Sequence, residues 1–225
     1  MSSSFPQYQA VITGDVVRSG RLSNQKFRNV QEIIKRGGDE LSQRFPQSMP
    51  LPIQMFRGDS WQFVVMKPVD ALRIALYFRA YLRAEATIDT RLSIGVGTID
   101  SPSQQSVGEG RGEAFVLSGA WLDKKTPSRM RFAMSNQTPD TWWPARSIAA
   151  VLSVLDVVVA RWTSAQARAV CGALLEWKQE RIAENWPGEP ITQQAAGQHL
   201  ARAGWEGARE ALSYYEEVMV KWWSQ

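Results

Sequence analysis

The chain has 225 residues, of which 44% are hydrophobic, and this is enough for one or two domains with buried cores. Its formal net charge of +4 is a mild basic excess that does not by itself indicate an anionic partner. A single cysteine, Cys171, excludes a disulfide bond within the chain and a multi-cysteine metal site, and the single histidine, His199, argues against cysteine–histidine and serine–histidine hydrolases.

The N-terminal part, up to residue 136, alternates between strand-like and helix-like patterns. Tyr8–Thr13 is a continuous apolar run, Leu22–Phe45 has apolar residues at helical spacing, and Thr90–Ile99 alternates as a strand does. The expected elements are a strand at 8–13, a helix at 22–45, a hairpin at 54–66, a helix from residue 68, a strand at 90–99, a helix at 113–123 and a strand at 130–134. This β-α-β-β-α-β-α-β order predicts an α+β fold, a ferredoxin-like sheet domain with an extra helix and strand.

After residue 136 the pattern becomes almost entirely helical. Helices are expected at 140–160 and 163–185, the second capped by Thr163 or Ser164. A short helix at 193–200, a turn at 201–204 and a longer helix at 205–223 then resemble a helix-turn-helix unit. We therefore predict a sheet domain at 1–136, a connecting helix at 137–162 and a helical helix-turn-helix module at 163–225.

No part of the chain is expected to cross a membrane. The first ten residues lack the basic and apolar regions of a signal peptide. The longest apolar run, 148–160, contains Asp156 and is shorter than the ~20 residues that a membrane helix needs. These features predict a soluble, cytoplasmic protein.

Two apolar runs each end on a Gly-Asp pair. Gly14-Asp15 closes the first expected strand, and Gly58-Asp59 lies at the tip of the expected hairpin. Two carboxylates that lie close together repel each other unless a cation sits between them, and Mg²⁺ prefers one or two carboxylates plus substrate phosphates. We predict a divalent-metal site at Asp15 and Asp59, with Mg²⁺ as the expected ion. The alternative is that each aspartate only satisfies backbone donors in its own turn.

Basic residues near the two aspartates are candidates for binding a nucleotide or another phosphate ligand. Arg18 and Arg57 flank the Gly-Asp pairs, while Arg111 ends a glycine-rich polar loop and Lys124 follows the third expected helix. Glycines in such a loop let backbone N–H groups approach a phosphate. A solvated loop with ordinary surface charges is the alternative.

The C-terminal module offers candidate DNA-binding residues. These are Gln193, Gln194, Arg202 and Arg209, side chains of the kinds that contact bases and phosphates. The last helix, however, carries four glutamates that phosphates would avoid: Glu206, Glu210, Glu216 and Glu217. Protein interaction or dimerisation is therefore an alternative role for this module.

The paired aspartates are similar to those of the palm-like catalytic domain of class III nucleotidyl cyclases, where two aspartates hold two metal ions. The chain also resembles the bacterial SatD family in an ordered set of motifs. These are Val11-Ile12-Thr13-Gly14-Asp15-Val16-Val17-Arg18-Ser19, Arg57-Gly58-Asp59-Ser60-Trp61-Gln62, Ile94-Gly95-Val96-Gly97, Gly112-Glu113-Ala114, Leu155-Asp156 and Arg161-Trp162-Thr163. The resemblance implies a cyclase-like palm domain joined to a DNA-binding type of module.

One departure from class III cyclases bears on activity. Their third helix offers an asparagine and an arginine to the ribose and phosphate, whereas Val116 and Ala120 stand near those positions here. Neither can donate a side-chain hydrogen bond, so the expected stabilisation of transition-state charge is missing. The chain is therefore not expected to be an active cyclase.

Three functions follow from these patterns. The first is a regulatory protein whose palm domain binds a divalent metal and a nucleotide or phosphate ligand, and whose helical module binds DNA or a partner protein. The second is a metal-dependent nucleotidyl cyclase or nucleotidyltransferase, and the third is a non-catalytic dimeric adaptor. A homodimer is expected because cyclase-like domains pair to complete their sites, with Trp142 and Trp143 as candidate interface residues.

Overall fold

The computed structural model describes residues 8–56, 58–100, 110–122, 128–135 and 139–223. Its strands are β1 (Gln9–Val16), β2 (Gln54–Phe56), β3 (Ser60–Val65), β4 (Thr90–Gly97) and β5 (Met130–Met134). They form one sheet in the order β2-β3-β1-β4-β5, in which β1 runs antiparallel to β3 and β4, and β5 runs parallel to β4. The first four strands have the ferredoxin-like order, so the α+β fold is confirmed, with β5 added at one edge.

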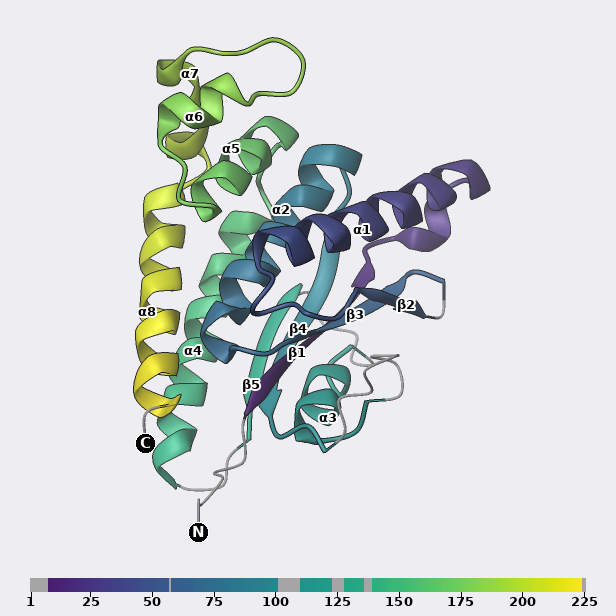
Figure 1. Ribbon diagram of the computed structural model, residues 1–225, viewed down its shortest axis with the longest axis vertical. Coiled ribbons are helices and arrows are strands. Elements are labelled where there is room, and N and C mark those ends of the chain that lie inside the picture. Colours follow the sequence, from purple (N-terminus) through teal and green to yellow (C-terminus); the bar gives the residue numbers. More distant parts are fainter. Residues whose placement is uncertain (1–7, 57, 101–109, 123–127, 136–138, 224–225) are drawn as a thin grey trace.

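Helices cover both faces of the sheet (Figure 1). Helices α1 (Asn24–Arg44) and α2 (Ala71–Ala86) lie on one face, each connecting two strands of the ferredoxin-like unit, and the shorter α3 (Glu113–Gly119) lies on the other. Alternation along β1 supplies both faces, since Ile12 belongs to the main apolar core while Val11 packs against Ala114 of α3. Short 3-10 helices at Ser19–Arg21 and Pro68–Asp70 complete this part of the chain.

Helix α1 contains two adjacent glycines because it packs closely against its neighbours. A Cβ atom on Gly38 would lie 2.1 Å from the Ile53 side chain, and one on Gly37 would lie 2.8 Å from Tyr81. Ser23 caps the helix as its sequence position suggests, its hydroxyl accepting a hydrogen bond from the Lys26 backbone N–H. Close packing therefore explains these glycines despite their low helix propensity.

The C-terminal part is helical and packs directly on the sheet domain. Its helices are α4 (Pro139–Val159), α5 (Ser164–Leu174), α6 (Gln179–Glu184), α7 (Gln193–Arg202) and α8 (Trp205–Trp223). Helix α4 packs against β5, α8 packs against α4, and α5 packs against α2 (Figure 1). One buried cluster contains residues from all three predicted segments, among them Ile12, Leu152 and Tyr215. The division into three segments stays a prediction. Within the described ranges, no helix is long and apolar enough to cross a membrane.

The single helix predicted at 163–185 is wrong, because the chain forms two helices there. The capping box of Thr163 and Gln166 starts α5 as expected, but α5 ends at Leu174. Glu176 then adopts a left-handed backbone conformation, with φ 61, that an α-helix cannot contain. The turn brings α6 back onto α5, where Ile182 packs against Gly172 so closely that a Cβ there would lie 2.6 Å away.

A buried ionic network joins α4 to the sheet domain. The Arg79 side chain on α2 is fully buried and binds Asp89 through Nε and Nη2, at 2.8 and 3.1 Å. Its Nη1 binds Asp156 of α4 at 2.6 Å, while Arg83 and Arg129 also pair with Asp89. These hydrogen bonds hold the pKa of Asp89 below its usual value despite burial, which acts in the opposite direction.

Candidate functional site

The fold brings the two predicted metal-binding aspartates to the same end of the sheet. Asp15 pairs with Ser60 across the β1–β3 ladder, and the Val16 N–H donates to the Asp59 carbonyl at 3.3 Å. Asp59 itself lies in the turn just before β3, so the two aspartates come from neighbouring positions at this end of the sheet. Asp59 accepts a hydrogen bond from the hydroxyl of Ser19, the first residue of the 3-10 helix after β1.

Asp15 is paired with an arginine that the sequence did not draw attention to. Arg91, at the start of β4, lies directly opposite Asp15 in the β1–β4 ladder. Its Nε donates to Asp15 Oδ1 at 2.8 Å, and its Nη2 donates to Oδ2 of the same carboxylate. Hydrogen bonding to Asp15, together with the negative charges of Asp15 and Asp59, raises the pKa of Arg91. One guanidinium therefore lies within electrostatic reach of both aspartates.

The Asp15 side chain borders a hollow of about 430 Å³ between the sheet and the end of α3. The hollow is lined by Thr13, Asp15, Phe56, Ser60, Gln62, Gly119 and Leu122. One carboxylate, two hydroxyls and one amide thus face a space with apolar side chains at its rim. Oxygen atoms of these kinds are the ligands that hard divalent cations prefer.

A chain of hydrogen bonds fixes the polar floor of the hollow. Gln62 Nε2 donates to Thr13 Oγ1 at 2.7 Å, and Thr13 Oγ1 lies 2.8 Å from Ser118 Oγ of α3. The Ser118 hydroxyl in turn donates to the Phe115 carbonyl at 3.1 Å. Since each hydroxyl can donate only once and Ser118 donates to Phe115, the Thr13 hydroxyl donates to Ser118 and accepts from Gln62.

The predicted phosphate-binding residues do not all lie beside the aspartates. Arg18 is exposed in the β1–α1 loop, next to Ser19. The backbone carbonyl of Arg111 accepts a hydrogen bond from the N–H of Asp100, which follows the end of β4. Asp15 pairs with the start of β4, so Arg111 lies toward the opposite end of the sheet. Arg57 and Lys124 lie outside the described residues.

Val116 and Ala120, the two apolar residues that the sequence singled out near the third helix, are both exposed. Val116 is 69% exposed, and Ala120 follows the end of the helix as its C-cap. The helix packs too closely on β4 for it to move nearer, because a Cβ on Gly95 would lie 2.4 Å from the Ala114 carbonyl oxygen. The described part of α3 therefore supplies no side-chain donor at Val116 or Ala120.

The predicted DNA-binding residues are exposed but are not equivalent. Gln193 and Gln194 begin α7, whose first turn is capped by the Thr192 hydroxyl, and Arg202 ends the same helix. Arg209 lies on α8 and pairs with the neighbouring carboxylates of Glu206 and Glu210. Three of the four candidates therefore share α7, while the fourth is already partly neutralised.

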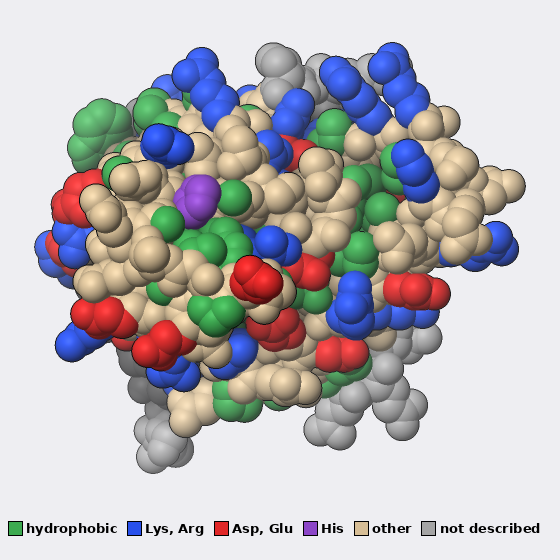
Figure 2. Space-filling view, turned by 90° about the horizontal axis from the view of Figure 1, so that it is seen from above, with side chains coloured by type: hydrophobic (Ala, Val, Ile, Leu, Met, Phe, Trp, Pro, Cys, Tyr) green, Lys and Arg blue, Asp and Glu red, His purple; other side chains and the backbone are tan. Residues whose placement is uncertain are grey.

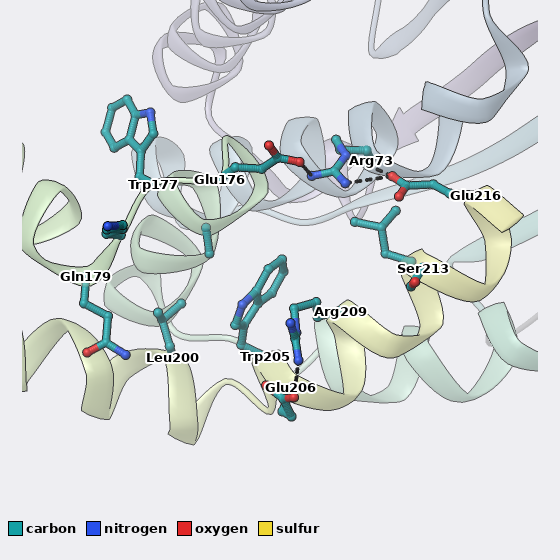
Figure 3. Close-up of a pocket in the computed structure, with 13 residues that line it drawn as sticks. Arg73, Glu176, Trp177, Gln179, Leu200, Trp205, Glu206, Arg209, Ser213 and Glu216 are labelled. Atoms are coloured by element: carbon teal, nitrogen blue, oxygen red, sulfur yellow. Dashed lines mark hydrogen bonds and ion pairs between the residues drawn. The ribbon is translucent and has the colours of Figure 1, made fainter.

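A second hollow, of about 590 Å³, lies between α2, the end of α5 and α8 (Figure 3). Arg73 of α2 points across it and binds Glu216 of α8, with Nε–Oε1 at 2.9 Å, and it also pairs with Glu176 at 3.4 Å. Its Nη1 further donates to the Leu174 carbonyl at 3.1 Å. Burial raises the pKa of Glu216. The charges in this hollow compensate one another and connect the helical part to α2.

Sequence reasoning missed Arg91 and Arg73, the residues that pair with acidic groups in the two hollows. Arg91 precedes the alternating apolar residues of β4, which makes it resemble an ordinary surface charge. One signal was available, since the first residues of β4 must lie opposite the last residues of β1 in the ferredoxin-like order. Nothing comparable pointed to Arg73, whose partners lie on helices distant in the sequence.

The chain matches no family model, and no curated protein sequence matches it. The solved structures to which it is similar include the guanylyl cyclase Cya2, at 11% identity and a TM-score of 0.35, covering 49% of this chain and 66% of that chain. A bacterial light-regulated adenylyl cyclase gives 16% identity and a TM-score of 0.38, covering 56% of this chain and 74% of the other. Another structure of such an adenylyl cyclase gives 15% identity and a TM-score of 0.37, with coverages of 56% and 42%.

These structural neighbours are nucleotidyl cyclases. The α+β fold of this chain is shown by the strand order of its own sheet. The resemblance to the SatD family stays a prediction.

Proposed function

We propose that the sheet domain binds a divalent metal ion together with a nucleotide or another phosphate ligand, beside Asp15 and Asp59. The observation that carries this proposal is the position of the two aspartates, one near the end of β1 and the other in the adjoining turn before β3, with Arg91 within electrostatic reach of both. The adjoining hollow of about 430 Å³ gives a ligand room next to Asp15. Ligand sites of this kind combine apolar walls with a few polar groups.

The residues fit a hard cation in their chemistry. Asp15, Asp59 and the hydroxyl of Ser60 supply oxygen atoms, and Mg²⁺ takes oxygen ligands while leaving other positions to water or substrate phosphates. Arg91 holds Asp15 in the structure, so the metal has to share or displace this guanidinium. When bound, the ion would neutralise charge between the two carboxylates and the ligand's phosphates. Within the described residues, no group of three or more His, Cys, Asp and Glu side chains adds further ligands.

The proposed role is binding rather than turnover. Val116 and Ala120 provide no donor for ribose or phosphate, and the two aspartates alone do not supply the charge stabilisation that phosphoryl chemistry needs. We therefore favour a regulatory protein over an active cyclase or nucleotidyltransferase. A product assay with nucleoside triphosphates would overturn this choice if the wild type formed a product and Asp59→Asn did not.

Thermal unfolding with Mg²⁺ and a nucleoside triphosphate, tested one nucleotide at a time, checks the binding proposal. At a ligand concentration of about 100 times Kd, we expect Tm to rise by roughly 5–10 °C. Asp59→Asn should abolish most of this rise, while Asp39→Asn, at an exposed position on α1, should keep it. Equal responses of the wild type and Asp59→Asn would contradict the proposed site.

As a second function, we propose that α7 contacts DNA. The supporting observation is a stripe of exposed polar side chains, Gln194, Gln198 and Arg202, which recur every fourth residue and so share one side of the helix. Figure 2 views this end of the molecule and shows His199 in purple, with Lys and Arg along one border and both charge signs elsewhere. The mixed surface favours contact through one helix over binding across the whole face.

Fluorescence anisotropy with a labelled random-sequence duplex over a range of salt concentrations tests this second proposal. Arg202→Ala should weaken binding and lower the slope of log K against log salt by about 1, as expected for one lost phosphate contact. Gln194→Ala should also weaken binding, whereas Lys35→Ala, which removes an exposed charge from α1, should not. Binding that ignores both α7 substitutions would refute the proposed surface. No binding even at low salt would favour a protein partner.

A further inference from the structure

Arg91 binds the carboxylate of Asp15, one of the two proposed metal ligands. Asp15 and Arg91 face each other across the β1–β4 ladder, so their side chains leave the sheet on the same face. The planar guanidinium binds both oxygens of the carboxylate, the geometry in which arginine pairs most strongly with an anion. One of the two carboxylates is therefore neutralised by the protein itself.

The negative and positive charges of Asp15, Asp59 and Arg91 do not balance. Asp15 and Asp59 carry two negative charges, and Arg91 carries one positive charge that both of them attract. With the guanidinium in place, a divalent ion meets one net negative charge instead of two. Because the attraction between ions scales with the product of their charges, Arg91 must weaken metal binding at Asp15.

We propose that Arg91 is an internal cation that competes with the divalent metal for Asp15 and thereby sets the metal affinity of the site. This inference rests on the proposed metal-binding function. Asp15 is fixed on the central strand β1 and has a side chain only 15% exposed, whereas the Arg91 side chain is 28% exposed at the start of β4. The arginine is the partner that can turn toward solvent. Once released, its guanidinium suits a phosphate group as well as it suits a carboxylate.

Binding of Mn²⁺ alone, measured by electron paramagnetic resonance of the free ion, tests the proposal without requiring any activity. Arg91→Gln removes the competing charge and should bind Mn²⁺ at least roughly tenfold more tightly than the wild type. Arg91→Lys keeps the charge but loses the two-point hydrogen bonding to Asp15, so its affinity should lie between those of the wild type and Arg91→Gln. Arg36→Gln, at an exposed position on α1, controls for the change in net charge and should leave the affinity unchanged. Circular dichroism establishes that each variant is folded.

A double variant tests whether the gain in Mn²⁺ affinity depends on Asp15. If Arg91→Gln acts by releasing Asp15, the tighter binding should disappear when Asp15→Asn is added. Equal Mn²⁺ affinities of the wild type and Arg91→Gln would overturn the competition while leaving the metal site standing. A gain that persists with Asp15→Asn would also overturn it. If neither the wild type nor Arg91→Gln bound Mn²⁺, the proposed metal function would fail, and this inference with it.

Discussion

Replacing Asp156 by asparagine tests how the C-terminal helices are joined to the sheet domain. Asp156 lies on α4 and is buried, and its Oδ1 accepts from Arg79 Nη1 at 2.6 Å. Its Oδ2 accepts from the Arg129 backbone N–H at 2.6 Å and from the Ser128 hydroxyl at 3.3 Å. Asparagine keeps the shape but removes the charge, and it places an NH₂ group where one oxygen accepts.

The expected cost follows from these contacts. The bond to Arg79 changes from charged–charged to charged–neutral, and the fully buried guanidinium then has Asp89 as its remaining carboxylate partner. If the asparagine oxygen faces Arg79, its NH₂ group faces the Arg129 N–H and leaves that donor unsatisfied, at about 1–3 kcal/mol. Breaking a buried ion pair costs about 3–5 kcal/mol in total, so we expect this loss from the free energy of unfolding. For a chain of this length that is a fall in Tm of roughly 10 °C.

Urea unfolding followed by tryptophan fluorescence measures this loss, and Asp39→Asn serves as the control. Asp39 is exposed on α1, so the same chemical change there should alter the free energy of unfolding by less than about 0.5 kcal/mol. An Asp156→Asn variant as stable as Asp39→Asn would show that the network contributes nothing to stability. That result would refute the reasoning even if the fold were unchanged.

Three further predictions concern stability. The folded-state pKa of Asp89 lies below its usual value near 3.8, so its contribution to the free energy of unfolding is present above that pH and is lost as the pH falls through the folded pKa. Asp89→Asn should therefore flatten the acidic part of a pH–stability curve measured by urea unfolding. Gly95→Ala should cost about 2–3 kcal/mol in thermal unfolding because its Cβ would lie 2.4 Å from a backbone oxygen of α3, whereas Gly119→Ala enters open space and should cost nothing. Thr163→Ala should lose about 1 kcal/mol through the α5 cap, and Thr163→Ser should not; equal stabilities of these two variants in urea unfolding would contradict a capping role.

Local sequence patterns determined most of the helices and strands, and they placed the candidate metal-binding aspartates at strand ends. The apolar run before Asp15 predicted β1, and alternation predicted β5 at Met130–Met134 with the bounds it has in the structure. The cap predicted at Thr163 or Ser164 is Thr163 in the structure, where its hydroxyl satisfies a backbone N–H in the first turn of α5. Ser23 does the same for α1. The Gly-Asp pairs placed two carboxylates at strand ends before any pairing was known.

Only the tertiary structure decided which groups meet. The partners of Asp15, Arg79 and Arg73 come from other strands and helices, and local periodicity contains no information about such contacts. The break after α5 is another example, because no glycine or proline marks it. Glu176 takes a left-handed conformation there while α6 packs back on α5. Burial of Ile182 against Gly172 stabilises that turn, which outweighs the local helix propensity that suggested one continuous helix.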